Sequence, residues 1–518
     1  MLLSGPRSPR HSSPFVHRVF EAHASDRPGA PAVTDSTGQY TYGELNTRAN
    51  RFAHTLTARG IGPGSLVGVC LHRSVDLVVA VLGVLKSGAA YVPLDPTYPA
   101  ERLRLNVAQL PAMTHVVASD ATRRLVDHGG IEVLAPDVAT AGSCDQASEG
   151  DPRPDLAPDA PCYVVFTSGS TGTPKAAAVR HEGWFNLLES LADSYGLGVE
   201  SSNLVVSSFG FDITQRSLLM PLFTGATLHL LPSRRFDVLL ARRLIREFGV
   251  RTLHCAPSTL YLLVGEGDED EANSPLASLR VLFCGGEALS AGRVSPWARG
   301  PGHRCRIVNL YGVAECSDAS TAHELHDWDR YVTSGVPAGL PLANTDVYVL
   351  GGDLAPVAPG ETGEICVAGR GVGAGYLNAD PLSRQRFTRL DTPQGAVELY
   401  RTGDLGRVGS DGELIFVGRT DSQVKVRGMR VDLGDVETAL RTLPDVADAA
   451  AVTTRGGELI AYVVPAPSMM VDAQAVRVAV RSSVPDHMVP QHVVLMPTFP
   501  LSPNGKVDRT ALTRLAHN

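Results

Sequence analysis

The first two thirds of the chain alternate between two hydrophobic patterns. Apolar residues recur at helical spacing over 42–59 and 76–88, and a short apolar run lies between them at 65–71. Glycine and proline separate these segments, which is typical of parallel strands joined by crossover helices. The alternation resumes with the run CYVVF at 162–166 and continues to about residue 320. This part is therefore predicted to be α/β, with a loop over 91–99.

The last third shows a pattern of short strands. Beyond about residue 340, four apolar runs separated by glycine and proline predict a β-rich, barrel-like subdomain: DVYVL, GEICVAG, ELYRTGD and ELIFVG. After Arg419 the pattern changes to QVKVRG, a helix at 435–443, two strands within 449–464, a helix near 472–483 and a closing loop over 501–512. About a hundred residues are enough for a small α+β domain.

These changes divide the chain into three predicted parts. They are a flexible N-terminal tail over 1–13, a large domain over 14–420 and a small domain over 421–518. Two segments without periodicity, 142–161 and the acidic 265–273, are predicted to be surface loops.

Composition excludes several classes of protein. The 518 residues carry 46 basic and 54 acidic side chains and are 43% hydrophobic, which is ordinary for a globular chain but too acidic for a general nucleic-acid binder. The eight cysteines include no C-x-x-C pair, so we expect reduced thiols and no zinc site. The N-terminus lacks a signal-peptide core, and the apolar run at 77–85 is too short for a membrane span. We expect a cytoplasmic protein with no membrane or nucleic-acid partner.

The basic residues are unevenly chosen, because only four are lysines and 42 are arginines. In a chain whose positive charges are almost all arginines, each remaining lysine is a candidate for a role that arginine cannot fill. Each of Lys86, Lys175, Lys425 and Lys506 is therefore a candidate functional residue, although Lys86 is expected only to face the dipole at the end of a helix.

The strongest motif is TSGSTGTPK at 167–175, directly after the strand predicted at 162–166. Its glycines allow a polyanion to approach the backbone, its hydroxyls donate hydrogen bonds and Lys175 adds a positive charge. The motif predicts a phosphate-binding loop, and the alternative is a flexible surface turn. It is not a Walker A loop, because Pro174 and Ala176 flank the lysine.

This loop resembles the signature of the adenylate-forming superfamily, which includes amino-acid adenylation domains of nonribosomal peptide synthetases, acyl- and aryl-CoA ligases and luciferases. Further segments resemble the family's motifs in order along the chain: TYGEL at 41–45, LKSGAAYVPLD at 85–95, NLYGVAE at 309–315, GEICV at 363–367, YRTGD at 400–404, GRTDSQVKVRG at 418–428 and PNGKVD at 503–508. The resemblance implies an α/β fold. Its large N-terminal domain contains two helix-flanked β-sheets and a β-barrel-like subdomain, and a small mobile α+β domain follows.

Activation of a carboxylate requires bound MgATP, a cation between the carboxylate and the α-phosphate, and exclusion of water. The resemblance implies that Tyr311 stacks on adenine, that Asp404 binds the ribose hydroxyls from a strand-to-loop position, and that Lys506 bridges the carboxylate and the α-phosphate. Glu315 is the expected Mg²⁺ ligand, and Asp421 is the expected hinge of the small domain. The predicted ATP-binding residues are Thr167, Ser168, Gly169, Ser170, Thr171, Gly172, Asn309, Tyr311, Gly312, Asp404 and Arg419, and the predicted catalytic residues are Lys175, Glu315 and Lys506.

Two positions depart from the family pattern. Val313 and Ala314 replace a Pro-Thr pair, so one hydroxyl for the α-phosphate is missing, at a cost of about 1–2 kcal/mol of transition-state binding. Ala176 replaces a glycine. Neither change removes a charge, so we expect a working but slower enzyme.

The segment at 211–214, FDIT, selects the subfamily. A buried aspartate that faces a pocket needs a cation, so Asp212 favours a substrate with an amino group, and the alternative is a helix N-cap. By resemblance the substrate pocket is lined by Asp212, Ile213, Arg216, His254, Phe283, Gly285, Leu310, Asp318 and Ala319.

The charges in this pocket leave the substrate open. Arg216 and Asp318 either pair with each other or meet a polar substrate, and we expect each to have a partner at all times. The residue set resembles pockets for glutamate-type side chains and, in part, those for hydroxyphenylglycine-type ones. A polar or carboxylate-bearing amino acid is the prediction, and a β-amino acid stays open.

No condensation motif and no carrier segment are recognisable. The resemblance then implies a free-standing enzyme that loads a separate carrier protein through its phosphopantetheine thiol, with dependence on an MbtH-like activating protein left open. The alternatives are an acyl- or aryl-CoA ligase and a catalytically silent binding protein.

Overall fold

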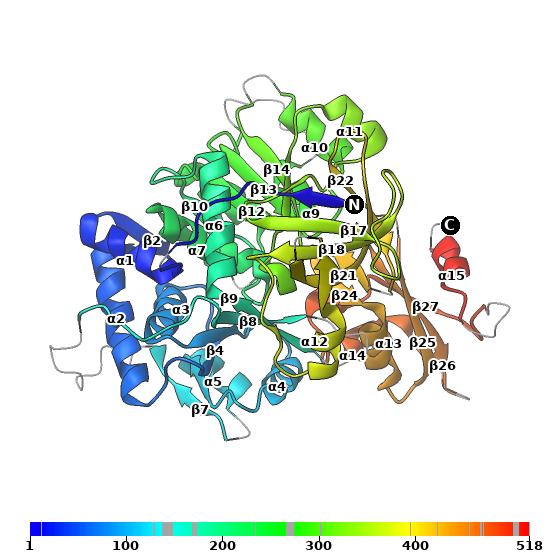
Figure 1. Cartoon of the computed structure of the whole chain (residues 1–518). Helices are drawn as coiled ribbons and strands as arrows, with labels where there is room; N and C mark the ends of the chain where they lie inside the picture. Colours follow the sequence, from blue (N-terminus) through cyan, green and yellow to red (C-terminus); the bar gives the residue numbers. More distant parts are fainter. Residues whose placement is uncertain are drawn as a thin grey trace.

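The computed structural model describes the chain except for residues 12, 128–129, 137–148, 168–173, 234, 266–273, 301–302, 394, 422, 455, 467–468, 470, 501–506 and 517–518. The predicted loops at 142–161 and 265–273 therefore lie partly or almost wholly outside the described residues. The described strands form three large sheets and two small ones (Figure 1).

One large sheet contains seven strands, most of them parallel. In spatial order they are β19 (Gly375–Tyr376), β9 (Lys175–Arg180), β8 (Pro161–Thr167), β5 (Ala90–Pro93), β4 (Leu66–Cys70), β6 (His115–Ala118) and β7 (Glu132–Leu134). Strand β5 corrects the loop predicted at 91–99: its residues are buried on both faces, and such strands read as short continuous apolar runs without alternation.

A second large sheet contains nine strands. In spatial order they are β16 (Leu340–Pro341), β15 (Thr321–Glu324), β14 (Arg306–Tyr311), β13 (Val281–Gly285), β12 (Thr252–Cys255), β10 (Asn203–Val205), β11 (Leu228–Leu230), β2 (Pro31–Asp35) and β3 (Gly38–Thr41).

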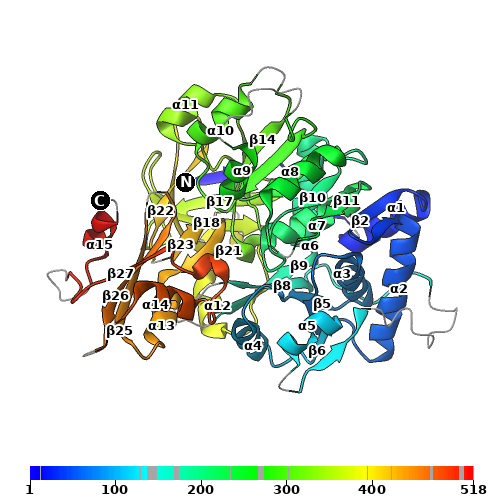
Figure 2. The same cartoon turned by 180° about the vertical axis from the view of Figure 1, so that it is seen from behind.

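Helices cover both faces of these two sheets (Figure 2). The helices between the sheets share one apolar core with strands of both: α1 (Val16–Asp26), α2 (Tyr42–Ala58), α3 (Val75–Ser87), α6 (His181–Tyr195) and α7 (Asp212–Thr224). The outer helices are α4 (Ala100–Ala108) and α5 (Asp120–Val126) on the seven-stranded sheet, and α8 (Val238–Glu247), α9 (Pro257–Val264), α10 (Ala291–Ala298) and α11 (Trp328–Ser334) on the nine-stranded sheet. Helix α3 is apolar on nearly every side because it lies in the central layer.

The third large sheet is the β-rich subdomain. It contains β1 (Leu2–Ser4), β17 (Thr345–Leu350), β18 (Gly363–Gly369), β21 (Gly395–Val408), β20 (Phe387–Thr392) and β22 (Leu414–Arg419), with α12 (Asp380–Arg386) before β20. Strand β1 corrects the flexible tail predicted over 1–13. Its backbone pairs antiparallel with β17 and satisfies an otherwise open sheet edge.

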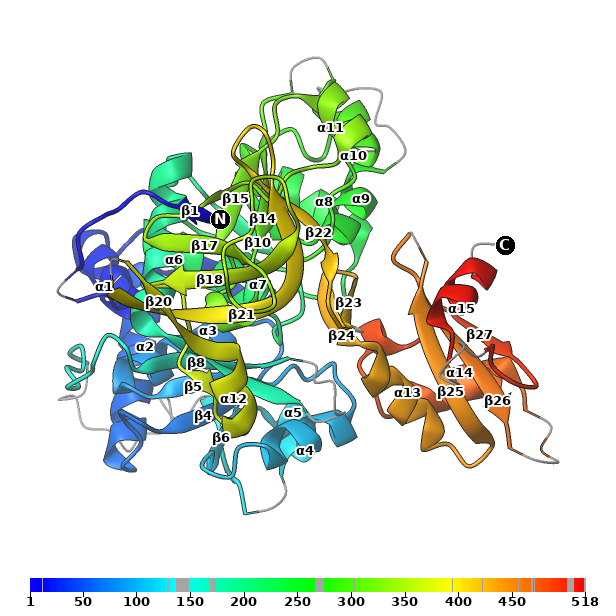
Figure 3. The same ribbon diagram turned by 45° about the vertical axis from the view of Figure 1, so that its right-hand side comes forward.

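The C-terminal part begins with the hairpin β23 (Gln423–Val426) and β24 (Met429–Asp432). A three-stranded sheet and three helices follow and stand to one side of the large sheets (Figure 3): α13 (Leu433–Arg441), β25 (Val446–Thr453), β26 (Leu459–Pro465), α14 (Ala473–Val480), β27 (His492–Leu495) and α15 (Arg509–Leu515). The last part of the loop predicted at 501–512 is wrong, because helix α15 begins at Arg509. Asp508 caps this helix by accepting a hydrogen bond from the Ala511 N–H at 2.9 Å. None of the described helices is long and apolar enough to cross a membrane.

Lys86 has a more specific role than the predicted dipole contact. It lies in the last turn of α3 and is fully buried, with Nζ 2.6 Å from Glu21 Oε1 and 3.0 Å from Asp151 Oδ1. Burial raises the pKa of Glu21, and Lys86 opposes that rise. The ammonium therefore joins α1, α3 and the segment before β8.

Replacing Lys86 by methionine is expected to destabilise the large domain by about 2 kcal/mol, because Glu21 Oε1 loses its buried cation while Glu21 Oε2 keeps Arg18 and Arg153. Urea unfolding followed by tryptophan fluorescence measures this change, because Trp184, Trp297 and Trp328 all lie in the large domain, before the β23–β24 hairpin. The double variant K86M/E21Q also removes the charge of the buried carboxylate and should recover part of the loss, although Arg18 and Arg153 then lose their charged partner at Glu21 Oε2. A double variant as unstable as K86M would contradict the ion-pair explanation.

Candidate active site

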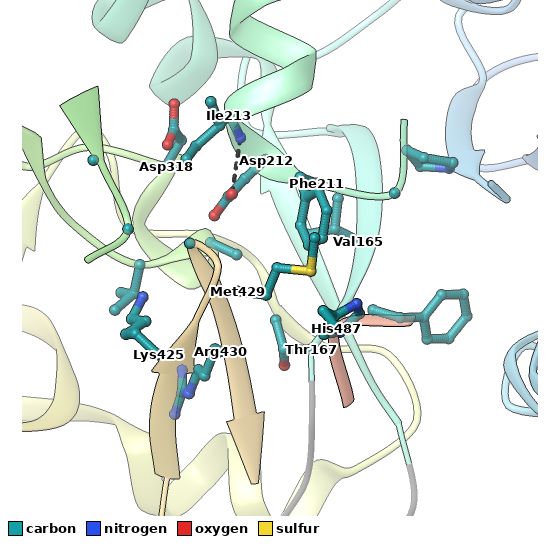
Figure 4. A pocket seen from close by; sticks show the side chains of 18 of the residues that line it. Val165, Thr167, Phe211, Asp212, Ile213, Asp318, Lys425, Met429, Arg430 and His487 are labelled. Carbon is teal, nitrogen blue, oxygen red and sulfur yellow. Dashed lines mark hydrogen bonds between the residues drawn. The ribbon is translucent and has the colours of Figure 1, made fainter. Parts of the chain in front are cut away.

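The predicted site residues converge on a cavity at the carboxyl ends of β8, β13 and β14, where open α/β sheets usually bind ligands. Asp212 and Asp318 lie on one side of the cavity, and Lys425, Met429 and Arg430 of the β23–β24 hairpin lie on the other (Figure 4). Its volume of about 90 Å³ is far below the 300–1,000 Å³ of ordinary ligand pockets. The hairpin therefore forms one wall of this small cavity and also borders a larger adjoining one of about 1450 Å³.

The two ends of the predicted phosphate loop meet beside this cavity. Thr167 closes β8, Lys175 opens β9, and the two residues are paired across the strands. Thr167 lines the cavity, and burial lowers the pKa of the half-buried Lys175. Ser168, Gly169, Ser170, Thr171 and Gly172 lie outside the described residues, so their phosphate contacts remain predictions.

The predicted ribose and adenine residues form one polar cluster. Asp404 is buried within strand β21, which corrects the predicted strand-to-loop position, and it pairs with Arg419 of β22. Its Oδ2 accepts a hydrogen bond from the Tyr311 hydroxyl at 2.7 Å, and burial together with Asp404 raises the pKa of Tyr311. The side chain of Asn309 points elsewhere, since its Nδ2 donates to the Pro337 carbonyl at 2.8 Å.

Local contacts explain the residue type at Gly312 and the position of the Asp421 side chain. Gly312 lines the cavity, and a Cβ there would lie 2.2 Å from the Asp318 carbonyl oxygen, so only glycine fits. The carboxylate of Asp421, the predicted hinge, accepts hydrogen bonds from Arg419 Nε at 2.7 Å and from the Gln423 N–H at 3.2 Å. Its role as a hinge remains a prediction.

Glu315 is buried in a short 3₁₀ turn, Ala314–Cys316. Its Oε1 accepts a hydrogen bond from the Tyr376 hydroxyl at 2.6 Å and lies 3.2 Å from Arg430 Nη1. Burial alone would raise the pKa of Glu315, but Arg430 and Tyr376 outweigh it and hold the pKa below its usual value. The group is therefore an ionised carboxylate.

The carboxylate of Glu315 fits an Mg²⁺ ion that is shared with phosphates. The described residues contain no cluster of three or more side chains able to hold a metal by themselves. Mg²⁺ usually binds one or two carboxylates and completes its shell with water and substrate phosphates. Glu315, on the cavity wall with Thr167, matches that donor set.

The residues predicted to form the substrate pocket lie on the cavity wall or directly behind it. Asp212 is the first residue of α7, and its Oδ1 accepts a hydrogen bond from the Ile213 N–H at 2.8 Å. Burial raises the pKa of Asp212, and the charge of Lys425 opposes that rise. The predicted residues that line the cavity are Asp212, Ile213, Arg216, Gly285, Leu310, Asp318 and Ala319.

His254 and Phe283 lie one layer behind the cavity wall. Their rings stack with centroids 4.9 Å apart, and the Arg216 guanidinium lies 5.9 Å from the Phe283 centroid. Burial and the Arg216 charge hold the pKa of His254 well below its usual value, so its ring is neutral.

Arg216 and Asp318 form a buried ion pair with each other, which is the first of the two arrangements predicted for these charges. Arg216 Nε lies 2.9 Å from Asp318 Oδ2, but the N–H is not aligned with the oxygen. Among the described residues, Arg216 Nη1 has no hydrogen-bond partner. Burial raises the pKa of Asp318 to about 7, opposed by Arg216. The pocket therefore contains an unused hydrogen-bond donor at Arg216 Nη1.

Sequence reasoning missed several cavity residues. Arg430 follows the GRTDSQVKVRG motif by two positions and reaches Glu315, whereas His487 and Met488 reach the cavity from a segment without any recognisable motif. Lys506 lies outside the described residues. Val507 packs against β25 and β26, and no described residue after Met488 lines the cavity.

Thr167, at the start of the predicted phosphate loop, and the carboxylate of Glu315 line one cavity, and comparison with known families identifies the class of protein. The profile of the AMP-binding enzyme family matches residues 20–377, and that of the AMP-binding enzyme C-terminal domain matches residues 435–506. The chain belongs to the AMP-binding enzyme family, whose members use ATP. Within that family, the chain is similar to the adenylation domains of nonribosomal peptide synthetases.

The relatives support this placement. The chain is 37% identical over 517 residues to the probable non-canonical nonribosomal peptide synthetase CymA of Salinispora arenicola, and 35% identical over 500 residues to the dimodular nonribosomal peptide synthase of Bacillus subtilis. The matches include 99% and 95% of this chain but only 6% and 20% of those much longer proteins.

Solved structures have the same fold. PA1221, a nonribosomal peptide synthetase protein with adenylation and PCP domains, is 28% identical with a TM-score of 0.81, covering 97% of this chain and 84% of that one. The amide bond synthetase McbA of Marinactinospora thermotolerans is 25% identical with a TM-score of 0.84, covering 97% and 99%. The α/β fold is therefore confirmed.

Proposed function

We propose that this enzyme activates an amino acid as aminoacyl-AMP with release of pyrophosphate, and then transfers the aminoacyl group to the phosphopantetheine thiol of a carrier protein. The observation that carries the proposal is Asp212. It is buried on the wall of the cavity that also contains Thr167 and Glu315. A carboxylate in that position is stabilised by a substrate ammonium.

The residues that line the cavity, together with the neighbouring Lys175 and the cluster of Asp404, Arg419 and Tyr311, divide the work of the first half-reaction. Asp212 orients the amino group, while Thr167 and Lys175 hold phosphates at the ends of the loop. Asp404, with Arg419 beside it, binds the ribose, and Tyr311 stacks on the adenine. Mg²⁺ at Glu315 would supply positive charge to the phosphates. Most of the catalysis is then positioning and charge stabilisation.

The substrate side chain is proposed to carry a carboxylate or a carboxamide. Arg216 Nη1 is an unused donor on the cavity wall, and the neutral His254 behind it has no partner among the described residues for either ring nitrogen. An acceptor oxygen satisfies such groups, whereas an apolar side chain leaves them unpaired at a cost of about 1–3 kcal/mol each.

The double variant R216L/D318L tests this substrate class. It replaces the ion pair by apolar side chains, so neither charge is left unpaired in the core. We expect kcat/KM for an acidic or carboxamide substrate to fall roughly 10²-fold, since its side chain loses a charged donor, while leucine or methionine gains activity. Amino-acid-dependent ATP–pyrophosphate exchange measures both. Unchanged selectivity would contradict the assignment of Arg216.

Carrier loading is tested by incubating the enzyme, ATP and the amino acid with a phosphopantetheinylated carrier protein. We expect a thioester-linked aminoacyl group in the carrier's mass spectrum, cleavable by hydroxylamine. The alternative suggested by the resemblance to McbA is transfer to an amine, which gives a stable amide. Addition of an MbtH-like protein shows whether the activity depends on one.

A further inference from the structure

Two cavities meet at His487, a residue that has no role in the first half-reaction. The small cavity that contains Asp212 and the larger adjoining cavity of about 1450 Å³ are both lined by His487. It lies in the short 3₁₀ turn Asp486–Met488. In Figure 4 its ring lies on the wall of the small cavity, beside Phe211 and Met429. His487 is therefore placed where the site of activation opens into the larger space.

Two aromatic side chains of the large domain hold the ring of His487. The centroid of the His487 ring lies 5.8 Å from that of Phe211, with an angle of 66° between the ring planes, and 6.3 Å from that of Tyr98. Within the part of the chain that the structure describes, neither ring nitrogen of His487 has a hydrogen-bond partner. The ring is therefore fixed by packing, while its nitrogens stay available to a molecule in the cavities.

The groups around His487 keep its ring uncharged. Burial, together with the positive charges of Arg102 on α4 and Arg427 in the turn of the β23–β24 hairpin, lowers the pKa of His487 to about 3. The hydroxyl of Tyr98 keeps its proton, because burial raises its pKa. The carboxylate of the neighbouring Asp486 is paired with two other arginines, each at 3.1 Å. At neutral pH the imidazole is therefore neutral and one of its nitrogens can accept a proton.

The transfer step of the proposed function needs such an acceptor. A thiol with a pKa of about 8.5 is only a few per cent thiolate at pH 7, so its proton has to be removed as the sulfur attacks. In the described part of the chain, three titratable residues line both cavities: Tyr98, Lys425 and His487. Tyr98 is protonated, and Lys425 is a cation that interacts with Asp404 and Asp212. Of the three, His487 is the one that offers a lone pair.

We propose that His487 is the general base of the transfer step and accepts the proton of the phosphopantetheine thiol. This inference rests on the proposed function. The S–H proton moves to a ring nitrogen of His487 while the sulfur forms a C–S bond to the carbonyl carbon of aminoacyl-AMP. The C–O bond to the phosphate breaks, AMP leaves with that electron pair, and the imidazolium returns its proton to water in the larger cavity. Arg102 and Arg427 assist, because cations near a thiol favour its thiolate form.

The experiment isolates the transfer step and varies the pH. The full chain receives the ready-made adenylate of the amino acid that gives the strongest ATP–pyrophosphate exchange, with 4′-phosphopantetheine as the thiol. Single-turnover thioester formation is compared between wild type and H487Q from pH 6 to pH 8, after subtraction of the reaction without enzyme. At pH 7 we expect H487Q to be roughly 10²-fold slower, as is usual when a general base is lost.

The pH dependence separates this role from a structural one. Without a base the reaction waits for the thiolate, whose fraction rises about tenfold per pH unit below the thiol pKa. The ratio of wild-type to H487Q rates should therefore fall from roughly 10³ at pH 6 to roughly 10 at pH 8.

The matched control is H492Q, which changes an exposed histidine at the start of β27 and should stay within twofold of the wild type at every pH. Rescue of H487A by free imidazole, with no effect of imidazole on the wild type, would support the same assignment. Equal rates of H487Q and wild type would overturn the inference, as would a rate ratio that does not change with pH. A wild type that does not accelerate thioester formation would overturn the proposed transfer step itself, and the inference with it.

Discussion

Replacing Asp212 by asparagine is expected to lower kcat/KM for the amino acid in ATP–pyrophosphate exchange by roughly 10²–10³-fold. Asparagine retains the shape of the side chain and the oxygen that accepts from the Ile213 N–H. It removes the charge that offsets the substrate ammonium in a buried site. Loss of one partner of such a pair costs about 3–4 kcal/mol, which corresponds to that factor.

The matched control is D193N, which removes a carboxylate from an exposed position of α6 and should leave exchange unchanged. The Mg²⁺-dependent affinity for ATP should also be unchanged in D212N, because Asp212 belongs to the second substrate. If D212N retained most of its exchange activity, the ammonium would not be recognised there. The chain would then fit better among the acyl- and aryl-acid ligases.

Replacing Lys506 by alanine is expected to reduce aminoacyl-AMP formation by roughly 10²–10³-fold, the usual cost of removing one preorganised charge from a developing transition state. Arginine should not restore the rate, because a compact ammonium has to fit between the carboxylate and the α-phosphate. Single-turnover formation of aminoacyl-AMP measures the effect. R514Q, a change at an exposed position of α15, is the control.

The same variant should discriminate between the two half-reactions. When aminoacyl-AMP is supplied ready-made, K506A is expected to load the carrier at nearly the wild-type rate. The reason is that the cavity is lined by the β23–β24 hairpin and by no described residue after Met488. A K506A enzyme that fails equally in both half-reactions would indicate a general structural defect. K506R with full adenylation activity would contradict the proposed role of Lys506.

The fold class was predictable wherever a hydrophobic pattern was compatible with only one type of secondary structure. The run at 363–369 could only be a short strand, and it is β18. The loop predicted over 91–99 includes the last three residues of β5 (Ala90–Pro93), a strand that is buried on both faces and too short to show a periodic pattern. Strand β1 carries no local signal, since it depends on its pairing with β17 at the far end of the chain.

The site was predictable where chemistry and motif coincided. Asp212, Arg216 and Asp318 reach one cavity from α7 and from the turn after Glu315, and Arg216 pairs with Asp318 as one alternative required. Arg430 and His487 were missed because they reach this cavity from the C-terminal part of the chain. Which side chains face a site across such a junction depends on packing between distant segments.

The central claim is that one cavity joins a site for MgATP to a site for an amino acid. Amino-acid-dependent exchange of radiolabelled pyrophosphate into ATP, measured with the purified chain across a broad panel of amino acids and amine-free acids, tests it most directly. We predict exchange that requires Mg²⁺ and an amino acid and is strongest with a carboxylate- or carboxamide-bearing side chain. Exchange driven only by acids that lack an amino group, or no exchange with any amino acid even beside an MbtH-like protein, would contradict it.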